Sequence, residues 1–138
     1  MGTEDNKTAM KRMVTEYQSN GHDEQTLYDV ISADIVDHSA MPGMPPGRHG
    51  VKALHDAFFA AFSDFHGVIH DQIAEGDKVV TRKTLRGTHT GPWQGIEPTG
   101  RDVAIEVIDI VRIEGGQVVE HWNVVDRLGL MQQLGVIE

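Results

Sequence analysis

The sequence predicts an α+β fold in which a curved, mostly antiparallel sheet wraps around helices to form a cone with an internal pocket. Helical spacing of apolar residues is confined to the first half of the chain, and long alternating segments joined by glycine turns fill the second half. A bent sheet that closes around a long helix leaves a space suited to a small ligand. Because no repeat, linker or low-complexity tract interrupts the pattern, we expect a single domain over residues 1–138.

The first half predicts three helices and one proline-rich loop. An amphipathic helix is expected over Glu4–Asn20, on the spacing of Met10, Met13, Val14 and Tyr17. Asp23 is a suitable N-cap for a shorter helix that runs to about Ile31, and Ile35-Val36 follows as a short extended piece. The three prolines of His38–Gly47 predict a loop at the pocket rim. The third helix starts at about His49 and carries an apolar face of Val51, Leu54, Phe58, Phe59 and Phe62.

The second half predicts two hairpins and a short helical tail. The strands Phe65–Ala74 and Lys78–Thr90 form the first hairpin, and Gly91–Gly100 is a loop that contains Trp93. Asp102–Ile113 and Gln117–Val125 form the second hairpin, and Leu128–Val136 is a helical turn or two.

The turn of the second hairpin determines which side chains share a face. A three-residue loop, Glu114-Gly115-Gly116, would place Asp109 opposite His121 and Val107 opposite Asn123. Strand alternation then predicts a pocket face made of Ile105, Val107, Asp109, Val111, Val119, His121, Asn123 and Val125. The opposite face holds Glu106, Ile108, Ile110, Arg112, Val118, Glu120, Trp122, Val124 and Asp126. A two-residue turn would shift the partners by one and mix the two faces.

Three stretches are similar to the SnoaL-like polyketide cyclases, also called ester cyclases. They are His89-Thr-Gly-Pro-Trp-Gln-Gly-Ile-Glu-Pro-Thr-Gly100, Ile108-Asp-Ile-Val-Arg-Ile-Glu-Gly-Gly-Gln-Val-Val-Glu-His-Trp122 and Leu128-Gly-Leu-Met-Gln-Gln-Leu-Gly135. The resemblance implies a nuclear-transport-factor-2-like cone that often forms homo-oligomers. It also implies ring closure of polyketide esters by an intramolecular aldol condensation, without metal or cofactor.

The resemblance also indicates where the reacting groups lie. The family's general acid/base aspartate falls at Asn123, two residues after His121, and a neutral amide cannot accept and return a proton as a carboxylate does. The family's histidine on the neighbouring strand falls at Asp109, and its asparagine after the second helix falls at Asp37. Limonene-epoxide-hydrolase-like relatives also have an aspartate at the Asp109 position.

We therefore predict that Asp109, His121 and Asn123 are the catalytic residues. Asp109 would be the base, since a carboxylate in an apolar pocket should have a raised pKa. His121 would be its partner, and Asn123 with Asp37 would bind substrate oxygens. A structural role in hydrogen bonding is the alternative for each of these side chains. The predicted substrate-binding residues are Asp37, His38, Phe58, Phe62, Trp93 and Val107.

Composition excludes several classes of function. Twelve Lys and Arg against 21 Asp and Glu give a charge of −9, which argues against nucleic acid and anionic membranes as partners. The absence of cysteine excludes thiolate metal sites and disulfides, and no histidine pair has a helical acidic neighbour, so no metal is expected. The polar start, Met1–Asn6, is unlike a signal peptide, which predicts a cytoplasmic protein.

Three functions and one assembly follow as hypotheses. The first function is a cofactor-free lyase or isomerase that acts on a small apolar carbonyl or ester compound. The second is a non-catalytic small-molecule binding protein, and the third is a hydrolase in which Asp109 activates water. An apolar band that includes Ile108, Ile110 and Trp122 on the outer face predicts a homodimer or a higher homo-oligomer.

Overall fold

A computed structural model describes residues 2–19 and 21–137 of the chain. Its helices are α1 (Thr3–Arg12), a π-helix (Met13–Tyr17), α2 (Glu24–Val30), α3 (Arg48–Ala61) and α4 (Arg127–Leu134). Its strands are β1 (Ile31–Asp37), β2 (Phe62–Glu75), β3 (Lys78–His89), β4 (Asp102–Glu114) and β5 (Gln117–Val125).

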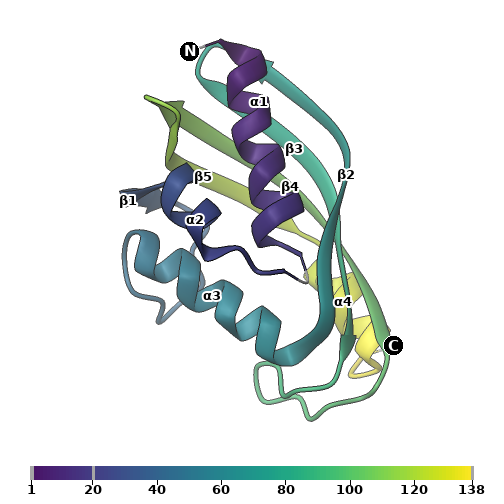
Figure 1. The fold of residues 1–138 in the computed structure, drawn as a ribbon. Helices are drawn as coiled ribbons and strands as arrows, with labels where there is room; N and C mark the ends of the chain where they lie inside the picture. The colour runs from purple at the N-terminus through teal and green to yellow at the C-terminus, as the bar shows by residue number, and fades with distance from the viewer. Residues whose placement is uncertain (1, 20, 138) are drawn as a thin grey trace.

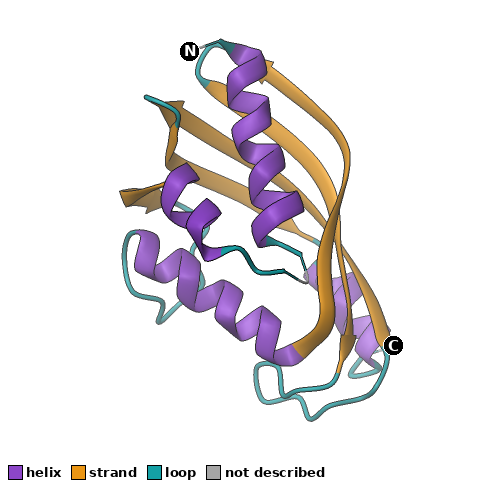
Figure 2. Cartoon of the chain, viewed as in Figure 1, coloured by secondary structure: helices purple, strands orange, loops and turns teal. Residues whose placement is uncertain are grey.

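The strands form one curved sheet in the order β1-β5-β4-β3-β2, and helices α1, α2 and α3 lie on its concave side (Figures 1 and 2). All neighbouring strands are antiparallel except β1 and β5, which are parallel. The predicted α+β cone with a mostly antiparallel sheet is therefore confirmed. Helix α4 packs on β4 and contributes Leu130 and Met131 to the wall of the interior cavity.

The first predicted helix changes its geometry before it ends. Residues from Met13 to Tyr17 form a π-helix, and Gln18 follows as the residue that caps it. A π turn accommodates an extra residue, so the side chains after it are rotated relative to an unbroken α-helix. The predicted end of the helix at Asn20 lies outside the described residues. Asp23 caps α2 as predicted, because its side chain accepts a hydrogen bond from the Gln25 amide.

Strand β2 starts earlier than the sequence predicts, at Phe62 rather than at Phe65. Phe62 was expected on the apolar face of the third helix, but it follows the last helical residue and has extended backbone geometry. Its side chain is buried in the core, and its ring packs near His89 and Trp93. Helix α3 therefore ends at Ala61, and the strand begins three residues earlier than the apolar pattern predicts.

The turn between β4 and β5 differs from the predicted one. Gly115 and Gly116 form a two-residue turn, both with positive φ, and Glu114 pairs with Gln117. A β-bulge then adds one residue, Val119, because Arg112 pairs with Glu120 while Ile113 pairs with Val118.

The bulge keeps the central residues on the predicted faces. Asp109 lies opposite Asn123 rather than His121, so the predicted partners were wrong by two positions. A shift of two preserves strand alternation, and His121 and Asn123 both point into the cone with Asp109. Between the turn and the bulge the predicted faces of β5 were wrong, because Val118 is buried and lines the cavity, whereas Val119 does not line it.

Two apolar clusters fill the cone on either side of Asp109. On the inward row of β4, Ile105 and Val107 belong to one cluster, and Val111 and Ile113 belong to the other. The same arrangement occurs on β3, where Val79 and Leu85 belong to different clusters and Thr81 and Lys83 lie between them. The polar residues of the interior are thus concentrated across the middle of the sheet.

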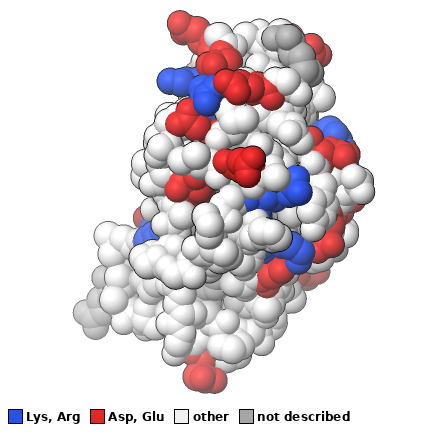
Figure 3. All heavy atoms as spheres, turned by 90° about the vertical axis from the view of Figure 1, so that its left-hand side faces the viewer, with Lys and Arg blue, Asp and Glu red and all other residues white. Residues whose placement is uncertain are grey.

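Lys and Arg are interspersed with Asp and Glu on the face shown in Figure 3 and do not gather into a basic patch there. The lower part of that face is largely uncharged. On this face the distribution agrees with the acidic net charge and differs from the basic patch that nucleic-acid binding requires.

The outer face of the sheet carries exposed apolar side chains. Ile108, Ile110 and Val124 are 43%, 36% and 74% exposed. A twofold dimer through this face stays a prediction. The wild-type protein should sediment as a dimer at micromolar concentration. Ile110→Lys, which places a charge in the middle of the band, should convert it to a folded monomer. A wild-type protein that sediments only as a monomer would contradict the dimer.

Gly91 fixes the start of the loop that carries Trp93. A Cβ atom at this position would lie 2.1 Å from the Ala60 carbonyl oxygen, and the Gly91 amide donates to the Ala61 carbonyl. We expect Gly91→Ala to lower the free energy of unfolding by about 1–3 kcal/mol, because the loop must move away from α3. Urea unfolding measures the change. Gly21→Ala, where the nearest atom is 3.7 Å away, is the control and should be nearly neutral.

Candidate active site

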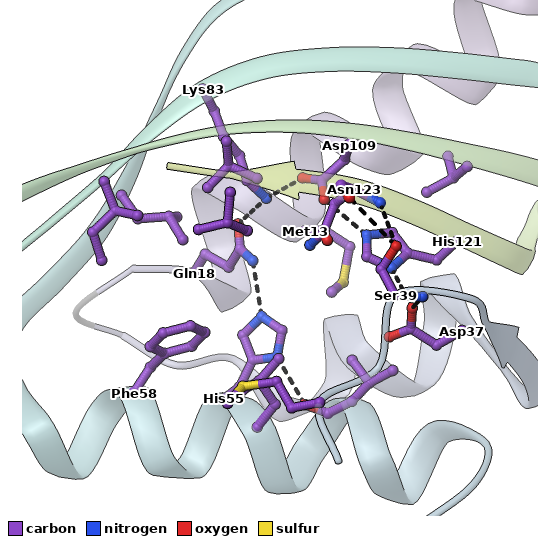
Figure 4. Close-up of a pocket in the computed structure, with 18 of the residues that line it drawn as sticks. Met13, Gln18, Asp37, Ser39, His55, Phe58, Lys83, Asp109, His121 and Asn123 are labelled. Atoms are coloured by element: carbon purple, nitrogen blue, oxygen red, sulfur yellow. Dashed lines mark hydrogen bonds and ion pairs between the residues drawn. The ribbon is translucent and has the colours of Figure 1, made fainter. Parts of the chain in front are cut away.

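The interior cavity lies between the concave face of the sheet and helix α3 and has a volume of about 160 Å³ (Figure 4). Most of its lining is apolar. The uncharged polar side chains that reach it include Gln18, Ser39, His55 and Asn123, and the ionic groups across its middle are Asp37, Lys83, Asp109 and His121. They come from β1, β3, β4, β5, α3, the end of the π-helix and the loop after β1. A small apolar cavity with a compact polar centre is typical of a small-molecule site.

Asp109 is the centre of the polar group, and its carboxylate contacts two cations. Its Oδ1 accepts a hydrogen bond from His121 Nε2 at 2.7 Å, and its Oδ2 lies 2.6 Å from Lys83 Nζ. Burial by itself would raise the pKa of Asp109, but the charge of Lys83 and the hydrogen bond from His121 lower it well below its usual range. The expectation of a raised pKa was therefore wrong, because sequence reasoning did not place Lys83 beside this carboxylate.

His121 lies between two carboxylates and binds one with each ring nitrogen. Nδ1 is 2.9 Å from Asp37 Oδ1, opposite the Asp109 contact. Burial lowers the pKa of His121, but the hydrogen bonds to Asp109 and Asp37 raise it more, to about 9. At neutral pH the ring is therefore an imidazolium that donates both protons.

Asp37 lines the cavity and contacts His121, and its predicted role as a ligand of substrate oxygens stays a prediction. Burial would raise its pKa, but the hydrogen bond and charge of His121 lower it, so it is a carboxylate at neutral pH. A carboxylate accepts hydrogen bonds and repels an anionic oxygen. The geometry makes Asp37 a residue that orients His121.

Asn123 and Ser39 join β5 to the loop that follows β1. The Ser39 hydroxyl accepts a hydrogen bond from the backbone N–H of Asn123 at 2.9 Å, and the backbone N–H of Ser39 donates to Asp37 Oδ1 at 3.0 Å. The Asn123 side chain lines the cavity directly across the strand pair from Asp109. Its amide group can donate to an oxygen atom bound beside Asp109.

Aromatic rings form the wall opposite the polar centre. Phe58 of α3 stacks on Trp93 with ring centroids 4.8 Å apart, and both line the cavity with Val107. These three residues therefore lie where a substrate-binding role would place them.

Two predicted substrate-binding residues lie elsewhere. Phe62 belongs to the core and does not line the cavity. His38 is exposed on the other side of the sheet, where it stacks on Trp122 and bonds to Glu120. Because His38 immediately follows β1, strand alternation turns its side chain away from Asp37 and from the cavity.

Sequence reasoning missed Lys83, Gln18 and His55. Lys83 donates to Gln18 Oε1 at 2.9 Å, and Gln18 Nε2 is 2.8 Å from His55 Nε2 (Figure 4). A signal for Lys83 was present, since it interrupts the inward row of Val79, Thr81 and Leu85. Gln18 and His55 gave no comparable signal, because the π-helix and the seating of α3 bring them to the cavity.

Within residues 2–19 and 21–137, no group of His, Asp and Glu side chains is arranged to hold a metal ion. None of the helices in the same ranges is long and apolar enough to cross a membrane.

A family model described as SnoaL-like polyketide cyclase matches residues 7–134. The chain belongs to this family. The curated relatives include aklanonic acid methyl ester cyclase DnrD of Streptomyces peucetius. It is 28% identical over 130 residues, which cover 91% of this chain and 88% of the relative.

Solved structures agree with this assignment. TsrD from Streptomyces laurentii superposes with a TM-score of 0.89 at 29% identity, and the match covers 99% of each chain. IdmH of Streptomyces antibioticus has a TM-score of 0.81 at 30% identity, over 94% of this chain and 98% of IdmH. The nuclear-transport-factor-2-like cone implied by the resemblance is confirmed.

The pKa of His121 predicts how stability depends on pH. A histidine whose pKa is raised on folding stabilises the fold fully below its unfolded pKa of about 6.5, and this stability is lost as pH rises through about 9. The free energy of unfolding should therefore fall between pH 6.5 and 9, and His121→Asn should remove most of that slope. Urea titrations across this range measure it. His49→Asn, on the exposed start of α3, is the control and should keep the slope.

Proposed function

We propose that the chain catalyses ring closure of a small, largely apolar carbonyl or ester compound without a cofactor. The reaction would begin with removal of a proton next to a carbonyl group and continue with an intramolecular aldol-type addition. The observation that carries the proposal is the buried Asp109 carboxylate, held between Lys83 and His121 in an otherwise apolar cavity. Membership of the SnoaL-like polyketide cyclase family supports the reaction class.

The roles follow from the charge of each group. Asp109 takes the proton as the C–H bond breaks, and the electron pair passes into the carbonyl as an enolate. The enolate carbon attacks a second carbonyl group in the same molecule, forming the C–C bond and an alkoxide. Protonated Asp109 then returns its proton to the alkoxide, so the enzyme ends in its starting state.

The other polar groups assist this proton transfer. Asn123 donates hydrogen bonds to the carbonyl oxygen, where negative charge develops. The His121 imidazolium lies beside Asp109, where it stabilises the negative charge of the enolate that forms there, and Asp37 holds the ring in place. Aromatic packing by Phe58 and Trp93 encloses the substrate and limits its contact with water.

A second candidate function is small-molecule binding without catalysis. Both oxygens of Asp109 contact a cation, and these contacts lower its pKa, which weakens it as a base. Exchange of substrate hydrogen for solvent deuterium distinguishes the two functions, because a binding protein would not accelerate it.

The test compound is aklanonic acid methyl ester, which the name of the relative DnrD specifies. We expect the wild-type protein to accelerate its cyclisation or its deuterium exchange. Asp109→Asn should lower that rate by about 10²–10⁴, the usual contribution of a positioned base. Nuclear magnetic resonance follows both reactions in deuterated solvent.

Asp102→Asn is the matched control, because this aspartate is exposed at the start of the same strand. It should leave the rate unchanged. A folded Asp109→Asn protein that turns over the compound at the wild-type rate would contradict the role of Asp109. If the wild-type protein binds the compound and accelerates neither reaction, the binding function is the better account.

A further inference from the structure

Lys83 has one more hydrogen-bond donor than the surrounding protein uses. An ammonium group carries three N–H donors. In the described part of the chain, Nζ contacts Asp109 Oδ2 and Gln18 Oε1. The side chain is 5% exposed and lines the cavity, so it has little access to bulk solvent. Its third donor is therefore available to an oxygen atom of a molecule bound in the cavity.

A relay from helix α3 fixes the direction in which Gln18 faces Lys83. His55 Nδ1 lies 2.8 Å from the Val51 carbonyl oxygen, which can only accept, so Nδ1 carries the proton. Nε2 then accepts a hydrogen bond from the Gln18 amide nitrogen. Gln18 must turn its oxygen toward Lys83 Nζ, at 2.9 Å. Burial supports this arrangement, since it lowers the pKa of His55 to about 4 and keeps the ring neutral.

Three neighbouring strands place the donors around Asp109. Lys83 lies on β3, Asp109 on the central strand β4 and Asn123 on β5, and all three side chains line the cavity (Figure 4). A compound with two carbonyl groups separated by one carbon can present one oxygen to each outer strand. Its central carbon then lies over the carboxylate.

We propose that Lys83 is the oxyanion-binding residue of this cavity. It holds one oxygen of the enolate of a 1,3-dicarbonyl compound, while Asn123 holds the other oxygen. Gln18 and His55 position the Lys83 side chain. The proposal rests on the proposed function and specifies the substrate class of the same site.

The charge balance of the site favours this assignment. Within the ion-paired cluster, Lys83 and His121 face Asp109 and Asp37, so its two cations are matched by two carboxylates. Arg127 also lines the cavity, but it is exposed at the start of α4 and forms no part of this cluster. When Asp109 takes a proton from the central carbon, it becomes neutral and the enolate acquires its negative charge. The net charge of the cavity does not change, and the charge stays beside Lys83. A carbon between two carbonyl groups is also acidic enough for a weak base.

The enolate of 5,5-dimethylcyclohexane-1,3-dione is a suitable probe, because this compound is a stable cyclic 1,3-dicarbonyl that cannot close a further ring. Calorimetry gives its affinity, and its ultraviolet spectrum distinguishes enolate from neutral enol. Asp109→Asn removes the carboxylate that competes for the two cations, so we expect this variant to bind the enolate at least about tenfold more tightly than the wild-type protein.

Replacing Lys83 in the same background isolates its contribution. The double variant Lys83→Met/Asp109→Asn removes both partners of the buried ion pair, which avoids leaving one charge unpaired. The double variant should bind the enolate at least about tenfold more weakly than Asp109→Asn does. Lys78→Met in the Asp109→Asn background is the matched control, because Lys78 lies at the exposed end of the same strand, and it should keep the high affinity.

The role of Gln18 requires a coupled measurement. Gln18→Leu should weaken enolate binding by about threefold in the Asp109→Asn background and have no effect when Lys83 is also replaced. An equal loss in both backgrounds would mean that Gln18 acts only on general stability, and the positioning role would be wrong.

Three results would overturn the oxyanion role of Lys83. They are equal affinity with and without Lys83, absence of enolate binding by Asp109→Asn, and a spectrum of neutral enol in the bound state. Any of these combined with the expected loss of turnover in Asp109→Asn would leave the proposed function intact. Enolate binding that depends on Lys83, together with wild-type turnover in Asp109→Asn, would instead contradict the proposed function.

Discussion

The ion pair between Lys83 and Asp109 is the interaction on which the interior of this protein depends. Its charged atoms are 2.6 Å apart, and both side chains are almost completely buried. Removing a charge from water costs several kcal/mol, and a close partner of opposite charge offsets most of that cost. The pair therefore requires β3 and β4 to keep their register, and it keeps polar atoms in a cavity that is otherwise apolar.

Two networks of hydrogen-bonded side chains, with opposite net charges, meet at this ion pair. On one side, Asp109 and Asp37 hold His121 as an imidazolium. On the other side, neutral His55 turns Gln18 so that its oxygen faces Lys83. Each hydrogen bond in these two networks joins a defined donor to a defined acceptor, so its direction is determined. A ligand meets donors that already have fixed orientations, and this reduces the reorganisation that accompanies charge transfer.

The resemblance and the structure place a carboxylate at different positions of the same fold. The resemblance puts the general acid/base aspartate at the position that Asn123 occupies. The carboxylate of this site lies directly across the strand pair, at Asp109. Such a change preserves the cone and the apolar walls formed by Phe58 and Trp93, because those depend on volume rather than charge. The chemistry of a site on this fold is therefore set by which strand supplies the carboxylate and which supplies its cation.

The sequence by itself determined the α+β cone, the helix cap at Asp23, and the common face of His121 and Asn123 on one strand. These features depend on local period, turn residues and alternation, and all three are properties of neighbouring residues. Only the tertiary structure decided the pairing of Asp109 with Asn123, since the Gly115-Gly116 turn and the bulge at Val119 compensate each other. It also decided the pKa of Asp109, because that depends on Lys83 from another strand, and the position of Gln18, because a π-helix rotates it toward the cavity.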